Sequence, residues 1–127
     1  MTALEIFELA SALMYETTSD DADSKKFSVQ FLNIHLQECL PAENSIRRFK
    51  GTTELTAAPW ITALETTIDF DDKITRGALP YALAYHFYLE ARDPATAAAM
   101  KMEFENALSR ASVCIEEDIT DAYATEA

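Results

Sequence analysis

The side chains that could perform chemistry in this chain are two pairs of carboxylates. Glu5 and Glu8 lie three residues apart, and so do Glu90 and Asp93. On a helix this spacing places both carboxylates of a pair on one face, where oxygen ligands could hold Mg²⁺ for hydrolysis of a nucleotide. However, such pairs are common in acidic helical proteins, these two are far apart in sequence, and Asp93 suits a helix cap better. We therefore expect no metal site and no enzyme activity.

The two histidines offer a second kind of chemistry. His35 and His86 each stand alone on a mostly apolar segment, and His86 could pair with Glu90 four residues later. A histidine in such a place is more often structural than catalytic or metal-binding. The sequence also lacks a phosphate-binding glycine-rich loop, a CxxC pair and an HExxH pair. We therefore expect no catalytic residue, no cofactor-binding residue and no cofactor.

Composition indicates which elements position these residues. The chain has 127 residues, of which 49% are hydrophobic, and it contains two glycines and four prolines. So few turn-forming residues argue against an all-β domain, and the length fits one domain over residues 1–127. We predict an all-α, compact bundle of about four main helices. A long, partly extended middle loop should separate them, with a possible short hairpin at residues 51–68.

The first half of the chain predicts two helices. Thr2 and Glu5 form a capping box for a helix that runs to about Tyr15. The acidic segment 16–24 predicts a loop, whose Asp23 or Ser24 could cap the next helix. That helix should end before Pro41, because the residue preceding a proline is disfavoured in the α region. A further helical turn is expected at residues 43–50.

The second half is marked by clear breaks. Gly51 leads into a threonine-rich segment, 52–67, that fits an extended loop or an edge strand. Within it, Trp60 either closes one end of the core or belongs to a binding loop. Asp71 or Asp72 should cap the following helix, which either kinks at Gly77–Pro80 or restarts with Pro80 in its first turn.

The last helix should begin at Asp93–Pro94, since aspartate is a good cap and proline is well tolerated at the first helical position. Apolar residues at helical spacing then continue to Ile115. Residues 116–127 are acidic and predict a flexible C-terminal tail.

The net charge of −12 limits the partners. Such a surface repels nucleic-acid phosphates and anionic membranes. It could aid solubility, bind a basic protein, or repel DNA that passes close by.

Cys39 and Cys114 are expected to be buried thiols rather than a disulfide, and the acidic N-terminus lacks the basic region of a signal peptide. We therefore expect synthesis in the cytoplasm.

Four segments in order carry a resemblance to a known family. These are LNIHLQECLPAENSIRR (32–48), WITALETTIDFDD (60–72), ALPYALAYHFYLEARDP (78–94) and FENAL (104–108). Their order resembles the head–tail connector (adaptor) proteins of tailed bacteriophages and prophages. In that family an apolar Leu-Pro-Tyr helix follows an acidic segment, and a short acidic turn leads to the last helix. One departure is Ala82, where the family pattern has glycine.

The resemblance implies a non-enzymatic virion protein at the head–tail interface, made in the host bacterial cytoplasm. Such connectors assemble as a ring of about twelve subunits below the portal protein. The ring extends the DNA channel, through which DNA passes without specific binding, and offers a platform to the next head-completion (stopper) or tail protein. Loops and the terminal segment make the contacts with the portal and with neighbouring copies, and no membrane is involved.

Two segments hold most of the expected contacts. The basic cluster at residues 47–50 should meet an acidic face of a neighbouring subunit. The tail should dock on the portal through Tyr123, its one aromatic residue. The candidate contact residues are Arg47, Arg48, Lys50, Trp60, Glu116, Glu117, Asp118 and Tyr123.

Two other classes of protein are alternatives. An acidic, DNA-mimic-like binding protein would occupy a basic partner, and the net charge fits it. The acids here concentrate in loops, caps and the tail rather than at phosphate-like intervals on one face. A mimic would stay monomeric or dimeric and compete with DNA, whereas a connector forms rings. The third class, an Mg²⁺-dependent nucleotide hydrolase, rests on the carboxylate pairs alone.

Overall fold

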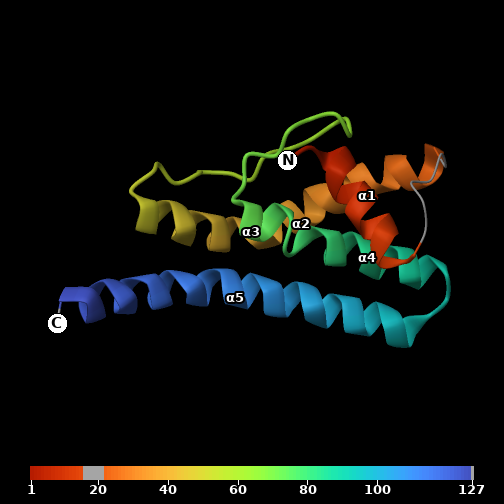
Figure 1. Ribbon diagram of the computed structural model, residues 1–127. Coiled ribbons are helices and arrows are strands. Elements are labelled where there is room, and N and C mark those ends of the chain that lie inside the picture. Colours follow the sequence, from red (N-terminus) through yellow and green to blue (C-terminus); the bar gives the residue numbers. More distant parts are fainter. Residues whose placement is uncertain (16–21, 127) are drawn as a thin grey trace.

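The computed structural model is an all-α protein, as predicted (Figure 1). It describes residues 1–15 and 22–126, and the side chains of 1–15 and 22–112. No strand forms in these ranges, and residues 16–21 of the loop predicted at 16–24 lie outside them. The helices are α1 (Ala3–Leu13), α2 (Ala22–Lys50), α3 (Asp72–Thr75), α4 (Leu79–Glu90) and α5 (Pro94–Glu126).

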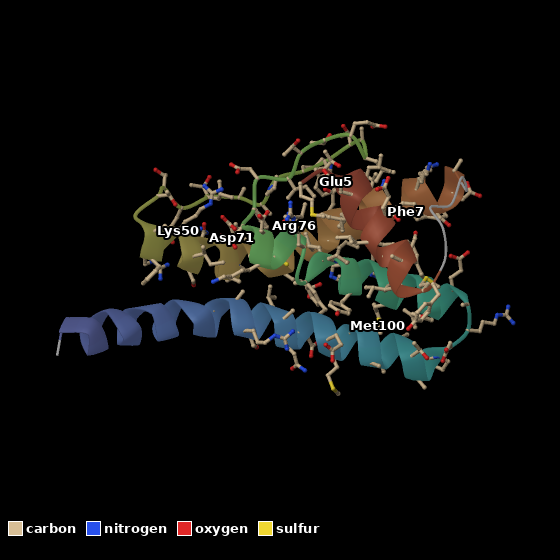
Figure 2. All side chains as sticks on the ribbon, in the orientation of Figure 1. Glu5, Phe7, Lys50, Asp71, Arg76 and Met100 are labelled. Atoms are coloured by element: carbon tan, nitrogen blue, oxygen red, sulfur yellow. The ribbon has the colours of Figure 1, made fainter. Side chains whose placement is uncertain are left out.

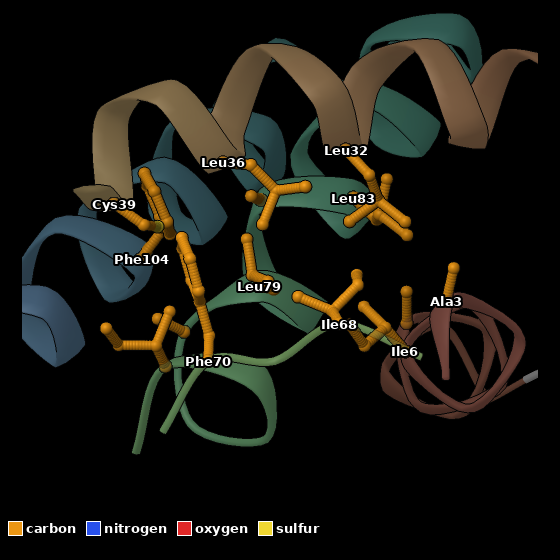
Figure 3. Packing of buried hydrophobic residues seen from close by; sticks show 14 of the residues in the cluster. Ala3, Ile6, Leu32, Leu36, Cys39, Ile68, Phe70, Leu79, Leu83 and Phe104 are labelled. Carbon is orange, nitrogen blue, oxygen red and sulfur yellow. The ribbon is translucent and has the colours of Figure 1, made fainter. Parts of the chain in front are cut away.

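The helix α4 is the centre of the bundle. It packs against each of the other helices, most extensively against α5 and α1. Its buried side chains include Leu79 and Leu83, which meet Leu36 of α2, Ile6 of α1 and Ile68 of the middle loop (Figure 3). Burying such aliphatic side chains contributes roughly 1.5–3 kcal/mol each, so this contact supplies much of the stability of the fold.

The helix α2 differs from the prediction in two places. It does not end before Pro41 but continues to Lys50, and Asp23 and Ser24 lie inside its first turn rather than capping it. Proline removes one backbone hydrogen bond and disfavours the helix before it. Beyond Pro41, however, Glu43 and Ile46 are buried, so tertiary contacts hold the helix together.

The other helix ends agree with local signals. Thr2 Oγ1 accepts a hydrogen bond from the Glu5 amide at 3.2 Å, and the Thr2 amide donates to Glu5 Oε1 at 3.1 Å, which completes the capping box. Asp71 caps α3, and α4 restarts with Pro80 in its first turn rather than continuing through a kink. Asp93 Oδ1 accepts from the Thr96 amide at 3.2 Å as α5 begins.

The helix α5 runs along one side of the molecule, and its end reaches past the end of α2 (Figure 1). Its backbone is helical through Glu126, where the sequence predicted a flexible tail at residues 116–127. The flexibility of that segment stays a prediction.

Candidate functional site

The middle loop, residues 51–71, is extended but is not a hairpin. Among the described residues, the loop makes a single β-type contact, an isolated bridge between Thr67 and Thr2. The Ala3 amide donates to Thr66 O at 3.1 Å, and the Leu4 amide to Leu64 O at 2.8 Å. Amides in the first turn of a helix have no partner within the helix, so those of α1 donate hydrogen bonds to carbonyl groups of the loop. The loop therefore pairs with the N-terminal segment instead of with itself.

Two asparagines of α2 fix the other side of the loop. Asn33 Nδ2 donates to Ile61 O at 2.9 Å, and its Oδ1 accepts from the Ile61 amide at 2.8 Å. Asn44 binds Leu55 in the same two-way manner, at 2.9 and 2.7 Å. Each side-chain amide thus makes the two hydrogen bonds to the loop backbone that a neighbouring strand would make in a sheet. The one signal in the sequence was asparagine in mid-helix, where it is a weak helix former.

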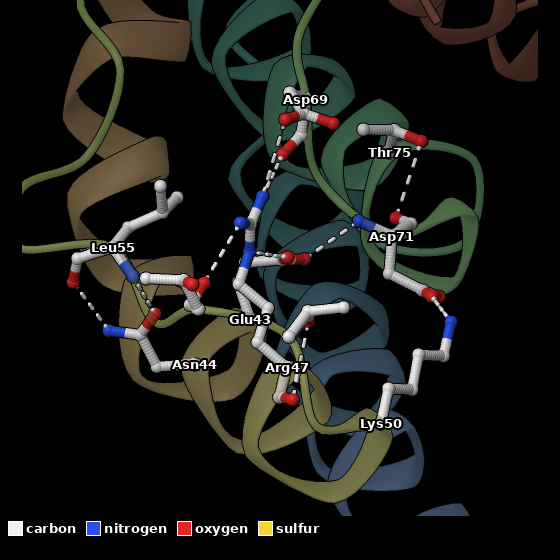
Figure 4. Close-up of polar contacts among 10 residues, drawn as sticks. Glu43, Asn44, Arg47, Lys50, Leu55, Asp69, Asp71 and Thr75 are labelled. Atoms are coloured by element: carbon white, nitrogen blue, oxygen red, sulfur yellow. Dashed lines mark hydrogen bonds and ion pairs between the residues drawn. The ribbon is translucent and has the colours of Figure 1, made fainter.

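The predicted basic cluster fastens the ends of the loop to α2. Arg47 Nε donates to the buried Glu43 carboxylate at 2.6 Å, and its Nη2 donates to Asp69 O at 2.9 Å (Figure 4). Lys50 Nζ lies 2.8 Å from Asp71 Oδ2, and Figure 2 shows these two residues at neighbouring ends of α2 and α3. Glu43 Oε1 also accepts from the Asp71 amide at 2.7 Å.

These contacts set the charge state of Asp71. Its partial burial would by itself raise the pKa of the carboxyl. The hydrogen bonds from Lys50 Nζ and from the Lys73 amide outweigh burial, so the pKa of Asp71 lies below its ordinary value. The carboxylate therefore stays charged and keeps the start of α3 fastened to the end of α2.

All three members of the basic cluster contact acids of their own chain, since Arg48 Nη2 also lies 2.8 Å from Glu54 Oε1. The Arg48–Glu54 pair is exposed, whereas Glu43 and Arg47 are largely buried. The expected contact of the cluster with a neighbouring subunit stays a prediction, and Arg48 is its most accessible member.

Trp60 does not close the core. Its side chain is 67% exposed, and the adjacent Ile61 is buried in its place. Because Asn33 holds the backbone of Ile61, Trp60 stands on a fixed segment and is free to contact a partner. The side chains of the other expected contacts, residues 116–118 and Tyr123, lie outside the described part of the chain.

The two histidines, far apart in sequence, meet in the structure. His35 Nε2 lies 2.8 Å from His86 Nε2, so the partner of His86 is His35 rather than Glu90, with which it could have paired. The His86 ring also stacks on Phe31, with ring centroids 3.8 Å apart and planes within 2°. One ring must donate and the other accept, so the pair requires at least one neutral imidazole.

Burial opposes protonation of this pair. Removal from water, together with the neighbouring His35, lowers the pKa of His86 to about 4. Burial also lowers the pKa of His35, although Glu38 Oε1 lies 3.0 Å from its Nδ1 and acts in the opposite sense. The contact with Glu38 does not have the angles of a hydrogen bond. Both rings are therefore neutral near pH 7.

His86 lies where two open pockets adjoin. One, of about 240 Å³, lies between Ile34, Tyr85 and Lys101, and the other, of about 270 Å³, is lined by Phe27 and Phe31. Because His86 lines both, we treat them as one groove between α2, α4 and α5, and call it the His86 groove. No sequence pattern predicted it, since its walls come from three helices.

The other described residues include few groups that could react or bind a metal. Cys39 is a free, buried thiol, and burial raises its pKa to about 12, so it is not a reactive thiolate. The side chain of Cys114 is outside the described residues. Within those residues, no three His, Cys, Asp or Glu side chains gather as metal ligands would. In the same part of the chain, no helix combines the length and apolar character needed to cross a membrane.

Comparison of the chain with protein-family models, with curated proteins and with solved structures finds no match.

Proposed function

We propose that this chain is a structural, non-enzymatic protein of a tailed-bacteriophage or prophage virion, a head–tail connector that forms a ring below the portal. There it would extend the DNA channel and offer a platform to the next head-completion or tail protein. The layout of the molecule carries the proposal: a compact helical body, from which α5 runs on past the end of α2 (Figure 1). Such bodies can stand side by side in a ring while the long helix reaches a neighbouring component.

Two further features support this proposal. The net charge of −12 repels phosphate, so DNA could slide through a ring of these subunits without being gripped. The fixed middle loop offers Trp60 to solvent, and an exposed tryptophan is a typical anchor of a protein interface.

Electron microscopy of the purified protein, alone and mixed with portal rings from the same phage or prophage, tests the proposal. We expect an additional ring of density coaxial with the portal. Portal particles that look the same with and without the protein would contradict it. If the protein instead competes with DNA for a basic partner, it is an acidic, DNA-mimic-like binding protein.

A further inference from the structure

The His86 groove presents an unusual amount of apolar surface. On α2, the side chains of Phe27 and Ile34 are 52% and 55% exposed, and Phe31 between them is half-buried. Positions 27, 31 and 34 lie on one face of a helix. A row of exposed apolar side chains beside an open groove is typical of a surface that binds a partner. The row and the groove together suit an amphipathic helix laid along α2.

The end of α5 has the pattern of such a helix. In its first half, Phe104 and Ala111 are buried against the bundle. The sequence continues the same helical face with Ile115, Ile119 and Ala122, at intervals of four and three residues. By the same periodicity, acids such as Glu117 and Asp121 belong to the opposite face. By sequence, the apolar pattern of α5 therefore continues as far as Ala122, with Asp118 and Glu126 at helical spacing beside it.

The groove and the end of α5 lie at opposite ends of the molecule. The groove is built by residues 24–38 of α2, 82–90 of α4 and 101–104 of α5, whereas the far end of α5 lies past the last residue of α2 (Figure 1). Because α5 is one continuous helix, a chain cannot place this end in its own groove. A second copy can supply it, and such a head-to-tail contact repeats from copy to copy until the ring closes.

The lengths agree. At a rise of about 1.5 Å per residue, the segment 115–126 is about 18 Å long. By the same rise, the groove wall from Phe27 to Glu38 on α2 is also about 18 Å long. The charges do not add attraction, since Lys101 lines the groove but so do Glu38 and Glu90. The contact would therefore depend on apolar burial.

We infer that residues 115–126 of one copy dock in the His86 groove of the next copy and join the subunits of the ring. This inference deepens the proposed function and rests on it, because it names the contact between neighbouring connector subunits. It gives to a neighbouring copy a segment that the sequence-based hypothesis gave to the portal.

Two full-length variants test the two sides of this contact. Ile34→Glu puts a charge into the groove at a side chain that is already exposed, and Ile119→Glu puts one on the apolar face of the segment. Met102→Glu is the control, because Met102 is 63% exposed and lines neither pocket. In sedimentation experiments over a range of concentrations, we expect the unmodified protein and the control to associate and each test variant to remain monomeric. Circular dichroism checks that all of them are folded.

Mixing the two test variants gives the sharpest result. The Ile119→Glu copy keeps an intact groove and the Ile34→Glu copy keeps an intact segment, so the mixture has one working contact. We expect one-to-one dimers and no larger species in light scattering after gel filtration. A mixture that remains monomeric, variants that associate like the control, or an unmodified protein that stays monomeric would overturn the inference. Because both surfaces are acidic, added salt should strengthen the association.

Binding to portal rings separates this inference from the proposed function. If Ile119→Glu loses self-association and still binds portal rings, the segment belongs to the neighbouring copy. If it self-associates normally and loses portal binding, the inference fails and the connector function stands. If the copies join head to tail but no variant or unmodified protein binds portal rings, the proposed function fails instead.

Discussion

At the scale of single residues, the pair of His35 and His86 makes the fold sensitive to acid. The pKa of His86 in the folded chain is about 4, below its ordinary value of 6.5. As the pH falls, the unfolded chain therefore binds this proton first, and the free energy of unfolding decreases between pH 6.5 and about 4. Above pH 6.5 the ring is neutral in both states and has no such effect.

Replacing His86 by phenylalanine should reduce this pH dependence. Phenylalanine keeps a ring against Phe31 but binds no proton, so the curve of stability against pH should flatten over that interval. Urea unfolding of both proteins at several pH values measures it, and acids such as Asp93 titrate in both and cancel in the difference. Identical pH profiles for the two proteins would show that His86 does not experience the burial described.

Glu43 is the residue on which the fastening of the loop depends. Its carboxylate accepts from Arg47 Nε and from the Asp71 amide. Glu43→Ala should destabilise the protein by about 2–3 kcal/mol, because it leaves Arg47 Nε and this amide without their acceptor. Arg48→Ala, which removes an exposed pair, is the matched control and should change stability far less. Equal losses in denaturant titrations of the two variants would contradict this account.

At the scale of elements, three helix caps could be predicted from local signals, whereas the local signals at Pro41 and at Asp23 and Ser24 did not set the bounds of α2. The caps at Thr2, Asp71 and Asp93 depend on neighbouring residues, so the sequence predicts them. The continuation of α2 past Pro41 depends on burial of Glu43 and Ile46 by segments that are distant in sequence. The sequence shows the basic cluster, but most of its acidic partners could not be predicted, because Glu54, Asp69 and Asp71 come from the middle loop.

Pro41 should lower the stability of α2. Its side chain is exposed and it lies inside α2, where proline costs about 3 kcal/mol relative to alanine. Pro41→Ala should therefore stabilise the protein, by about 1–3 kcal/mol once the greater freedom of the unfolded variant is subtracted. The midpoint of urea unfolding should rise. A lower midpoint would mean that the bundle needs a bend at this proline.

At the scale of the whole molecule, the charge and the helical composition could be predicted from the sequence, and the His86 groove could not. Its walls come from α2, α4 and α5, and a groove between helices appears only when their packing is known. In the proposed ring, the charge of −12 would keep the subunits from holding DNA. The connector proposal therefore depends on a partner, the portal, more than on any single residue.

The mass of the complex with portal rings, measured by native mass spectrometry, tests that proposal most directly. We predict that each portal ring gains one 14.2 kDa chain per portal subunit, in a complete set rather than in scattered numbers. A portal whose mass does not change in the presence of excess protein would contradict the account.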